Sequence, residues 1–160
     1  MPNNNNSLVN GIENFICFEE YDKVPGFIVS QTAYTIRKNI AMGFKEQDID
    51  LTPHEFALIN RLAIHLQLNQ KALAELTYKD RPAVTRMLHR LINKGLVEKQ
   101  INNDDRRAFL VALTDEGRKL RDRAVPIAQA VLTQGLKEIT PDELEITIST
   151  LKRINGNLTP

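Results

Sequence analysis

The chain has 160 residues, of which 42% are hydrophobic and 26% are charged, and this composition is typical of a soluble protein with one domain and room for an added helical layer. No run approaches the roughly 18 apolar residues that cross a bilayer, and the start MPNNNNSLVNG lacks the pattern of a secretory signal. We therefore expect a cytoplasmic protein without membrane contact. The single cysteine, Cys17, excludes an internal disulfide and any multi-cysteine metal site.

The net charge of +1 conceals a strongly basic segment. Residues 79–107 contain eight Lys or Arg and four Asp or Glu, so this segment carries +4 and the remainder of the chain is slightly acidic. A local cluster of positive charge on an otherwise acidic body is typical of a protein that touches nucleic acid with one surface.

The first part of the chain predicts an extension and two helices. Residues 1–24 form an N-terminal extension that is Asn-rich at its start. From Pro25 onward, apolar residues recur every three or four positions and predict a helix that ends before residues 48–51. The segment TPHE at 52–55 places Thr at the N-cap, Pro at the first helical position and Glu at the third. This capping box predicts a helix that continues to about residue 66.

The middle of the chain predicts two short helices and a two-stranded ribbon. The helices are expected at residues 70–76 and 82–94, with a turn between them and Gly95 ending the second. Two strands rich in branched and aromatic residues are expected at 96–101 and 108–113, joined by turn-forming Asn and Asp residues.

Two longer helices complete the chain. Thr114 caps the first of them. Pro126 lies inside this helix and is expected to bend it, because proline removes one backbone hydrogen bond and clashes with the carbonyl four residues earlier. The segment TPDE at 140–143 repeats the capping box and predicts a last helix to about residue 158.

Together these elements predict a mainly α fold with a small β-ribbon wing. A winged helix-turn-helix domain at residues 51–114 is flanked by helices at 25–50 and 115–160. Two short helices and a ribbon bury only a small core alone, so the flanking helices must supply the rest. Because the flanking helices carry more apolar surface than a monomer needs, we expect them to form the dimerisation layer of a homodimer.

The helix at 82–94 divides into an apolar face and a polar, basic face. An α-helix fits the major groove of DNA, where Arg can bind guanine bidentately and Thr can contact a base edge or a phosphate. A solvated basic face is the more common fate of such charges, and the spacing alone does not distinguish the two. The apolar face holds Val84, Met87, Leu88 and Leu91, and the polar face holds Pro82, Thr85, Arg86, His89 and Asn93, with Arg90 at its edge.

The loop at 102–107 adds two adjacent arginines at the tip of the ribbon. Arg106 and Arg107 can reach the minor groove, whose negative potential attracts guanidinium groups, and Asp105 can hold the side chain of Arg107 in place. A polar turn with incidental charges explains the Asn and Asp residues equally well. It does not explain two arginines placed just beyond a recognition-like helix.

Several motifs occur in the order found in one family of transcriptional regulators. The family's wing has the pattern D-x-R, then an apolar strand, then L-T, then a helix that contains Gly, and the segment DDRRAFLVALTDEGRKL resembles it. Asp105 and Arg107 match D-x-R, Leu113 and Thr114 match L-T, and Gly117 matches the Gly. LNQKALAEL and VTRMLHRLINKGLVEK resemble the DNA-reading helix pair and the first strand, and LTPHEF resembles the start of the family's second helix. Over roughly residues 27–159 the chain resembles the MarR family of winged helix-turn-helix regulators.

This resemblance implies a homodimer that binds a pseudo-palindromic operator in double-stranded DNA. The recognition helices would enter successive major grooves and the wings would reach the flanking minor grooves. Family members are commonly repressors released by a small aromatic or anionic effector, so a ligand-responsive repressor is the expected function. The candidate DNA-binding residues are Pro82, Ala83, Thr85, Arg86, His89 and Arg90 in the recognition helix and Asp105, Arg106 and Arg107 in the wing.

Two other functions stay open. A thiol-based redox sensor would act through Cys17, since one branch of the family senses peroxide with a cysteine in its first helix; here Cys17 lies ahead of that helix, and a lone cysteine is more often a small buried residue. The other is a winged-helix module that binds only proteins. His54, His65 and His89 lack metal-ligand spacing, and no nucleophile elbow or phosphate-binding loop occurs. We therefore expect no metal, no cofactor and no enzymatic activity.

Overall fold

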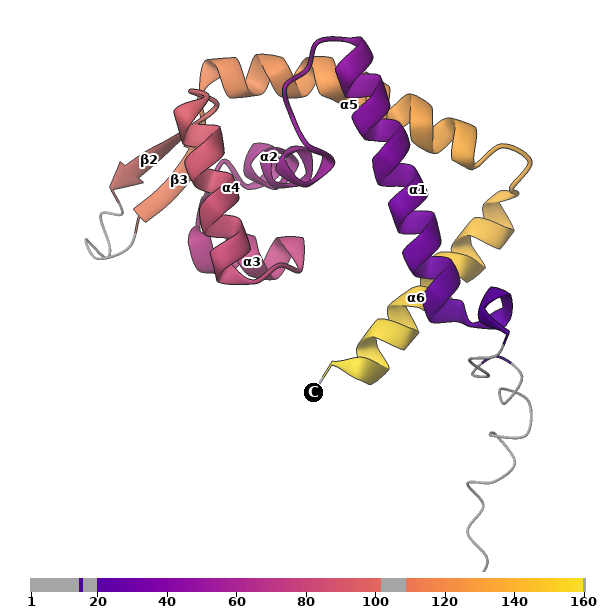
Figure 1. Ribbon diagram of the computed structural model, residues 1–160. Helices are drawn as coiled ribbons and strands as arrows, with labels where there is room; N and C mark the ends of the chain where they lie inside the picture. Colours follow the sequence, from indigo (N-terminus) through magenta and orange to yellow (C-terminus); the bar gives the residue numbers. More distant parts are fainter. Residues whose placement is uncertain (1–14, 16–19, 102–108, 160) are drawn as a thin grey trace, which may run out of the picture.

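The computed structural model describes residues 15, 20–101 and 109–159 (Figure 1). Cys17 and the wing residues Asp105, Arg106 and Arg107 lie outside the described residues. The predicted helices, and the predicted ribbon strands where they are described, are confirmed to within one or two residues. The elements, in chain order, are a short 3-10 helix (Tyr21–Lys23), α1 (Pro25–Glu46), α2 (Pro53–His65), β1 (Gln67–Asn69), α3 (Gln70–Thr77), α4 (Arg81–Asn93), β2 (Val97–Ile101), β3 (Phe109–Leu113), α5 (Asp115–Gly135) and α6 (Pro141–Leu158).

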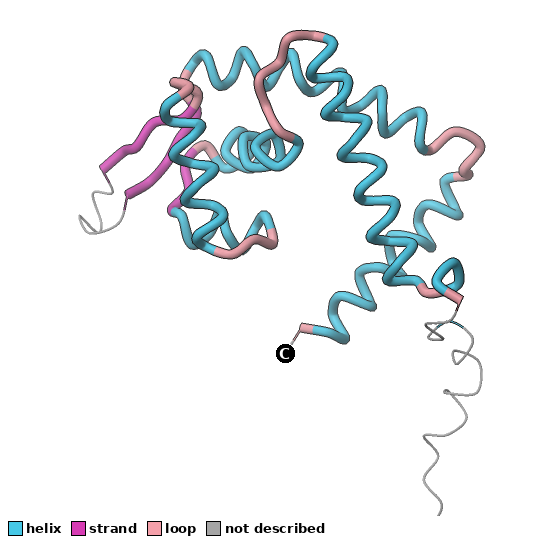
Figure 2. Tube along the Cα trace, in the orientation of Figure 1, coloured by secondary structure: helices cyan, strands magenta, loops and turns pink. Residues whose placement is uncertain are grey.

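The elements form two parts that are joined by α5 (Figures 1 and 2). The helices α2, α3 and α4 gather with the strands at one end, and we call the elements from α2 to β3 the winged-helix unit. The helices α1, α5 and α6 form what we call the helical layer. Helix α5 starts at the sheet and runs away from the winged-helix unit to α6 (Figure 1), packing against α1 and α2 on its way.

The strands form one antiparallel sheet in the order β1-β3-β2. The predicted ribbon is the β2–β3 pair, in which Val97 lies opposite Leu113. The sequence does not predict β1, because three residues, QLN, are too few to show the alternation that marks a strand. This strand forms because β3 has a second edge with unpaired backbone groups, and β1 pairs with them, Leu68 lying opposite Val111.

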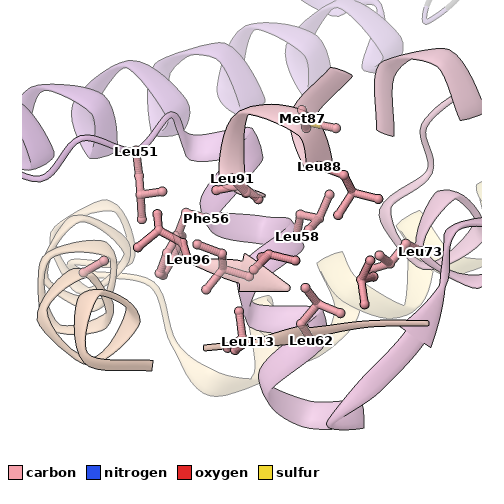
Figure 3. Packing of buried hydrophobic residues seen from close by; sticks show 14 of the residues in the cluster. Leu51, Phe56, Leu58, Leu62, Leu73, Met87, Leu88, Leu91, Leu96 and Leu113 are labelled. Atoms are coloured by element: carbon pink, nitrogen blue, oxygen red, sulfur yellow. The ribbon is translucent and has the colours of Figure 1, made fainter. Parts of the chain in front are cut away.

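The hydrophobic core fills the space between α2, α3, α4 and the sheet (Figure 3). It continues into the helical layer through Phe44 of α1. The ring of Phe44 meets the ring of Phe56 in α2 edge-on, with centroids 5.3 Å apart and an interplanar angle of 77°. Burial on both sides of α2 therefore ties the winged-helix unit to the helical layer. The most deeply buried side chains of the winged-helix unit include Leu58, Ile59, Leu62, Leu73, Val84, Leu91 and Val97.

Both predicted capping boxes are present. At α2, the Glu55 amide donates to Thr52 Oγ1 at 3.1 Å and the Thr52 amide donates to Glu55 Oε2 at 2.9 Å. At α6, Thr140 and Glu143 make the same reciprocal pair. Each box satisfies two amides that would otherwise lack a partner at the helix start, so four local residues are enough to define where each helix begins.

The start of α5 is fastened to the sheet through Thr114. Its Oγ1 donates to the Gly95 carbonyl at 2.7 Å and accepts from the Gly117 amide at 3.0 Å, and its own amide donates to the Leu96 carbonyl at 3.1 Å. Gly117 lies so close to Leu96, the residue before β2, that a Cβ added to Gly117 would be 2.0 Å from the Leu96 carbonyl oxygen. The L-T and Gly positions of the resemblance therefore form the joint between the wing and α5.

Pro126 lies inside α5, as the sequence predicts. Figure 1 shows the axis of α5 turning toward α6 in the second half of the helix, which agrees with the expected bend. No helix within the described residues has both the length and the apolar character needed to span a membrane.

Candidate nucleic-acid interface

Helix α4 carries the candidate recognition residues and begins at an aspartate cap. Asp80 Oδ1 accepts a hydrogen bond from the Ala83 amide at 2.6 Å, and Pro82 lies in the first turn, where its missing N–H costs nothing. The predicted division of α4 into two faces is confirmed, while the DNA contacts assigned to the outer face stay a prediction. The inner face holds Val84, Met87, Leu88 and Leu91, all buried, and the outer face holds Pro82, Arg86, His89 and Asn93, all exposed.

Two arginines on α4 are exposed. Arg81 and Arg86 make no side-chain hydrogen bond or ion pair with any residue that the structure describes. Arg81 is not among the residues predicted from the sequence to bind DNA, because the sequence pattern places it in the turn before the helix. The structure places it in the first turn of α4, and its position inside the basic segment is the signal that could have identified it.

Thr85 is held by its neighbours. Its Oγ1 donates to the Arg81 carbonyl at 2.8 Å and accepts a hydrogen bond from Nε2 of Gln70, the first residue of α3. The contact braces α3 and α4 against each other. The hydroxyl that the sequence analysis assigns to DNA is therefore engaged within the protein.

Arg90 pairs with a buried carboxylate. Its Nε donates to Glu55 Oε1 at 2.8 Å, and Glu55 is only 1% exposed while the Arg90 side chain is 55% exposed. Glu55 comes from the capping box of α2, so this ion pair connects the start of α2 to α4. From the sequence, Glu55 is predicted only as a capping residue, because nothing within its own helix indicates a partner 35 positions away.

A second cation completes the surroundings of Glu55. Lys94 Nζ lies 3.9 Å from Glu55 Oε2, donates to the Asp50 carbonyl at 2.8 Å and lies 3.1 Å from Asp50 Oδ1. Burial on its own raises the pKa of the Glu55 carboxyl. The hydrogen bonds from the Thr52 amide and from Arg90, together with the charge of Lys94, outweigh burial and hold this pKa below its usual value.

A concave surface lies between α3, α4 and the sheet, with a volume of about 450 Å³. Its apolar floor includes Leu88 and Val111, and three cations border it: Lys71 of α3, Arg81 of α4 and Lys99 of β2. Lys99 Nζ lies 5.4 Å from the centre of the exposed Phe109 ring, a cation–π contact across the two ribbon strands. Two cations of the basic segment, Arg81 and Lys99, thus border this hollow beside α4 together with Lys71.

The remaining DNA-binding candidates lie in the wing loop. Strand β2 ends at Ile101 and β3 begins at Phe109, so the loop that joins them, with its three candidate residues, lies outside the described residues. Within the described residues, no three His, Cys, Asp or Glu side chains gather as a metal site. Burial, and then the charges of Lys79 and Arg37, lower the pKa of His54.

Comparison with known proteins identifies the family. The model of the MarR family matches residues 49–108. The multiple antibiotic resistance protein MarR of Escherichia coli (strain K12) is 31% identical over 107 residues, which are 66% of this chain and 74% of that protein. The chain belongs to the MarR family.

Other MarR-family matches extend the likeness to most of the fold. Transcriptional regulator HosA of Escherichia coli O157:H7 is 30% identical over 105 residues, which are 66% of this chain and 78% of that protein. The crystal structure of an E. coli MarR mutant complexed with operator DNA superposes with a TM-score of 0.76 at 24% identity, covering 84% of this chain and 96% of that chain. This MarR-family chain therefore shares the architecture of that regulator through its helical layer as well as its winged-helix unit.

Proposed function

We propose that this MarR-family chain is a DNA-binding transcriptional regulator that places α4 in the major groove. The observation that carries the proposal is the pair of exposed arginines, Arg81 and Arg86, with no partner among the described residues. On α5, by contrast, the exposed Arg118 and Lys119 are each paired with an acidic residue one turn earlier. Cations kept free on a helix whose opposite face is buried are available to phosphates and base edges.

The proposed contact surface extends from α4 in two directions. Lys71 and Lys99 border the hollow beside α4 and would face the phosphate backbone on either side of the groove. The wing would reach the minor groove with Arg106 and Arg107, oriented by Asp105. The proposed contacts in α4 are Pro82, Ala83, Thr85, Arg86, His89 and Arg90, to which the exposed position of Arg81 adds this residue.

We propose that the active form is a homodimer that is joined through the helical layer. Helix α6 has no buried residue, and α1, α5 and α6 line an apolar groove of about 630 Å³. Monomeric proteins rarely leave continuous apolar surface of this kind exposed. A twofold pair would also present two α4 helices to successive major grooves. Exposed large apolar residues on the three helices and in the connection between α5 and α6 include Tyr34, Met42, Leu132, Leu136, Ile139, Ile146 and Ile148.

The form of regulation follows from the family resemblance. We propose a repressor in the cytoplasm that leaves its operator when a small aromatic or anionic effector binds. The apolar groove of the helical layer and the hollow beside α4 are both large enough for such a molecule.

The test is the binding of the full chain to duplexes selected from random-sequence DNA, followed by fluorescence anisotropy at roughly 50–200 mM salt. We expect saturable binding that weakens as salt rises, because phosphate contacts release counterions. Arg86→Ala should cost about 1–3 kcal/mol of specific binding and relax the sequence preference. Arg153→Ala removes the same charge from the exposed surface of α6 and should leave the affinity unchanged.

Two outcomes would contradict the proposal. Absence of salt-dependent binding by the wild-type chain would leave a module that binds only proteins. If Arg86→Ala binds DNA as tightly as the wild-type chain, Arg86 is not part of the interface. Analytical ultracentrifugation of the free protein should give the mass of two chains, and a monomer at the concentrations used for DNA binding would refute the dimer.

A further inference from the structure

Glu55 is the one charged side chain that is fully buried among the described residues. Both of its oxygens are used. Oε2 accepts from the Thr52 amide and closes the capping box of α2, and Oε1 accepts from Arg90 Nε on α4. A capping box needs only the first of these contacts, as the exposed box of Thr140 and Glu143 in α6 demonstrates. The second contact therefore calls for a separate explanation.

The contact with Glu55 determines which part of Arg90 remains available. A guanidinium group is a flat fork with one N–H at Nε and two on each of Nη1 and Nη2. Because Nε faces the buried carboxylate, the Nη1–Nη2 edge is left, and no residue that the structure describes hydrogen-bonds to it. More than half of the Arg90 side chain is exposed although its Nε faces a buried carboxylate, and Arg86 precedes Arg90 by one turn of α4.

We propose that Glu55 is a positioning residue for DNA binding: its buried carboxylate holds Arg90 by Nε so that the Nη1–Nη2 edge is presented to a DNA phosphate. This inference rests on the proposed function and assigns a role in it to a residue that does not touch DNA. The ion pair fixes a long side chain before binding, so less rotamer freedom is lost when the phosphate is bound. A phosphate is the matching ligand, because the end of a guanidinium binds two of its oxygens at once.

The surroundings of Glu55 favour an orienting role over simple charge neutralisation. Lys94 already places a second positive charge 3.9 Å from Oε2, and Lys94 is itself anchored to Asp50. Arg90 is thus one of two cations beside the carboxylate, and it is the one with an open hydrogen-bonding edge at the surface. A lysine at position 90 could meet the carboxylate or a phosphate with its single ammonium group, but it has no second edge with which to hold both.

The experiment compares Glu55→Gln, Arg90→Ala, Arg90→Lys and the double variant Glu55→Gln/Arg90→Ala on the selected duplex. Arg90→Ala should lower the slope of log K against log salt by about 0.9, the loss of one phosphate contact. Glu55→Gln should weaken binding roughly 2- to 10-fold and lower the slope part of the way. In the Arg90→Ala background the same change at Glu55 should have no further effect, because there is no arginine left to position.

The matched control is Glu143→Gln, which changes the same capping position in α6, where no arginine is attached. It should leave both the affinity and the salt slope unchanged. Arg90→Lys keeps the charge at position 90 and does not alter Glu55, so it tests the inference even if Glu55→Gln destabilises the fold. We expect Arg90→Lys to bind almost as weakly as Arg90→Ala.

Several results would overturn the inference. Equal effects of Glu55→Gln with and without Arg90 would assign Glu55 a purely structural role. Tighter binding by Glu55→Gln would mean that the carboxylate only repels DNA, and wild-type affinity of Arg90→Lys would mean that orientation does not matter. Each of these leaves the proposed function intact, whereas a wild-type chain that binds no DNA removes both.

Discussion

Replacing Gly117 with alanine is expected to destabilise the protein, although helix propensity alone predicts the opposite. Gly117 lies in the first turn of α5, and alanine in a helix is favoured over glycine by up to about 1 kcal/mol. A Cβ at this position, however, would be 2.0 Å from the Leu96 carbonyl oxygen and 3.0 Å from its carbon. A carbon and a carbonyl oxygen approach no closer than about 3.3 Å, so the start of α5 must move by more than about 1 Å.

The cost of that movement follows from the contacts it breaks. Thr114 is held to the sheet by two hydrogen bonds, one to the Leu96 carbonyl and one to the Gly95 carbonyl, each contributing about 1 kcal/mol. Crowding of a packed site adds about 1–3 kcal/mol. After the gain in helix propensity is subtracted, Gly117→Ala should lower the free energy of unfolding by about 2–4 kcal/mol, or the Tm by roughly 5–15 °C.

The assay is urea and thermal unfolding followed by far-UV circular dichroism at one fixed protein concentration, since a dimer's stability depends on it. Gly156→Ala in α6 is the matched control, because a Cβ there meets nothing within 4 Å. It should be neutral or stabilising by up to about 1 kcal/mol. If Gly117→Ala is as stable as Gly156→Ala, the joint between the wing and α5 is softer than the contacts indicate, and the reasoning fails.

Three further predictions concern pH, the wing and the cysteine. Because the pKa of Glu55 is lowered on folding, its carboxylate contributes to stability above about pH 4.3, the pKa of an unfolded Glu, and this contribution is lost as the pH falls through the pKa of the folded state. The difference in urea midpoint between wild type and Glu55→Gln should therefore shrink in acid. A difference that stays constant with pH would refute a stabilising role of the Glu55 charge. Arg107→Ala should weaken DNA binding and leave the dimer whole, and a loss of dimer mass by sedimentation would point to a folding role instead. Cys17→Ser should bind DNA like wild type. If the protein is a redox sensor, peroxide treatment should abolish DNA binding by wild type but not by Cys17→Ser.

The elements of this fold that the sequence predicts are those whose signals are local. The two capping boxes, the stop at Gly95 and the apolar spacing of α4 each depend on residues within about one helical turn of one another. Local backbone hydrogen bonds decide these features in any context, so the observed boundaries differ from the predicted ones by only one or two residues. The wing residues are assigned from the position of two arginines in the loop and from the family resemblance, and they stay a prediction.

The features that the sequence does not predict depend on partners far along the chain. Strand β1 exists because β3, more than 40 positions later in the chain, offers an unpaired edge. The Glu55–Arg90 ion pair spans 35 positions and the Gln70–Thr85 contact spans 15. Side-chain periodicity identifies the face of a helix on which a residue lies, but it carries no information about which other element packs there.

Thr85 shows how a contact with another helix limits the DNA contacts that a side chain can make. The spacing of α4 assigns its hydroxyl to a base edge or to a phosphate, because a free hydroxyl can donate and accept. In the structure the one hydroxyl hydrogen is donated to the Arg81 carbonyl, and Gln70 donates to the oxygen. A phosphate only accepts hydrogen bonds, so Thr85 has no hydrogen to give it without breaking the contact with Arg81. The hydroxyl oxygen keeps one lone pair that can accept from the amino group of a base, and the methyl group can make an apolar contact with a thymine methyl in the major groove. Hydrogen bonds from α4 to DNA phosphates then fall to other residues, among them Arg81, Arg86 and the open edge of Arg90.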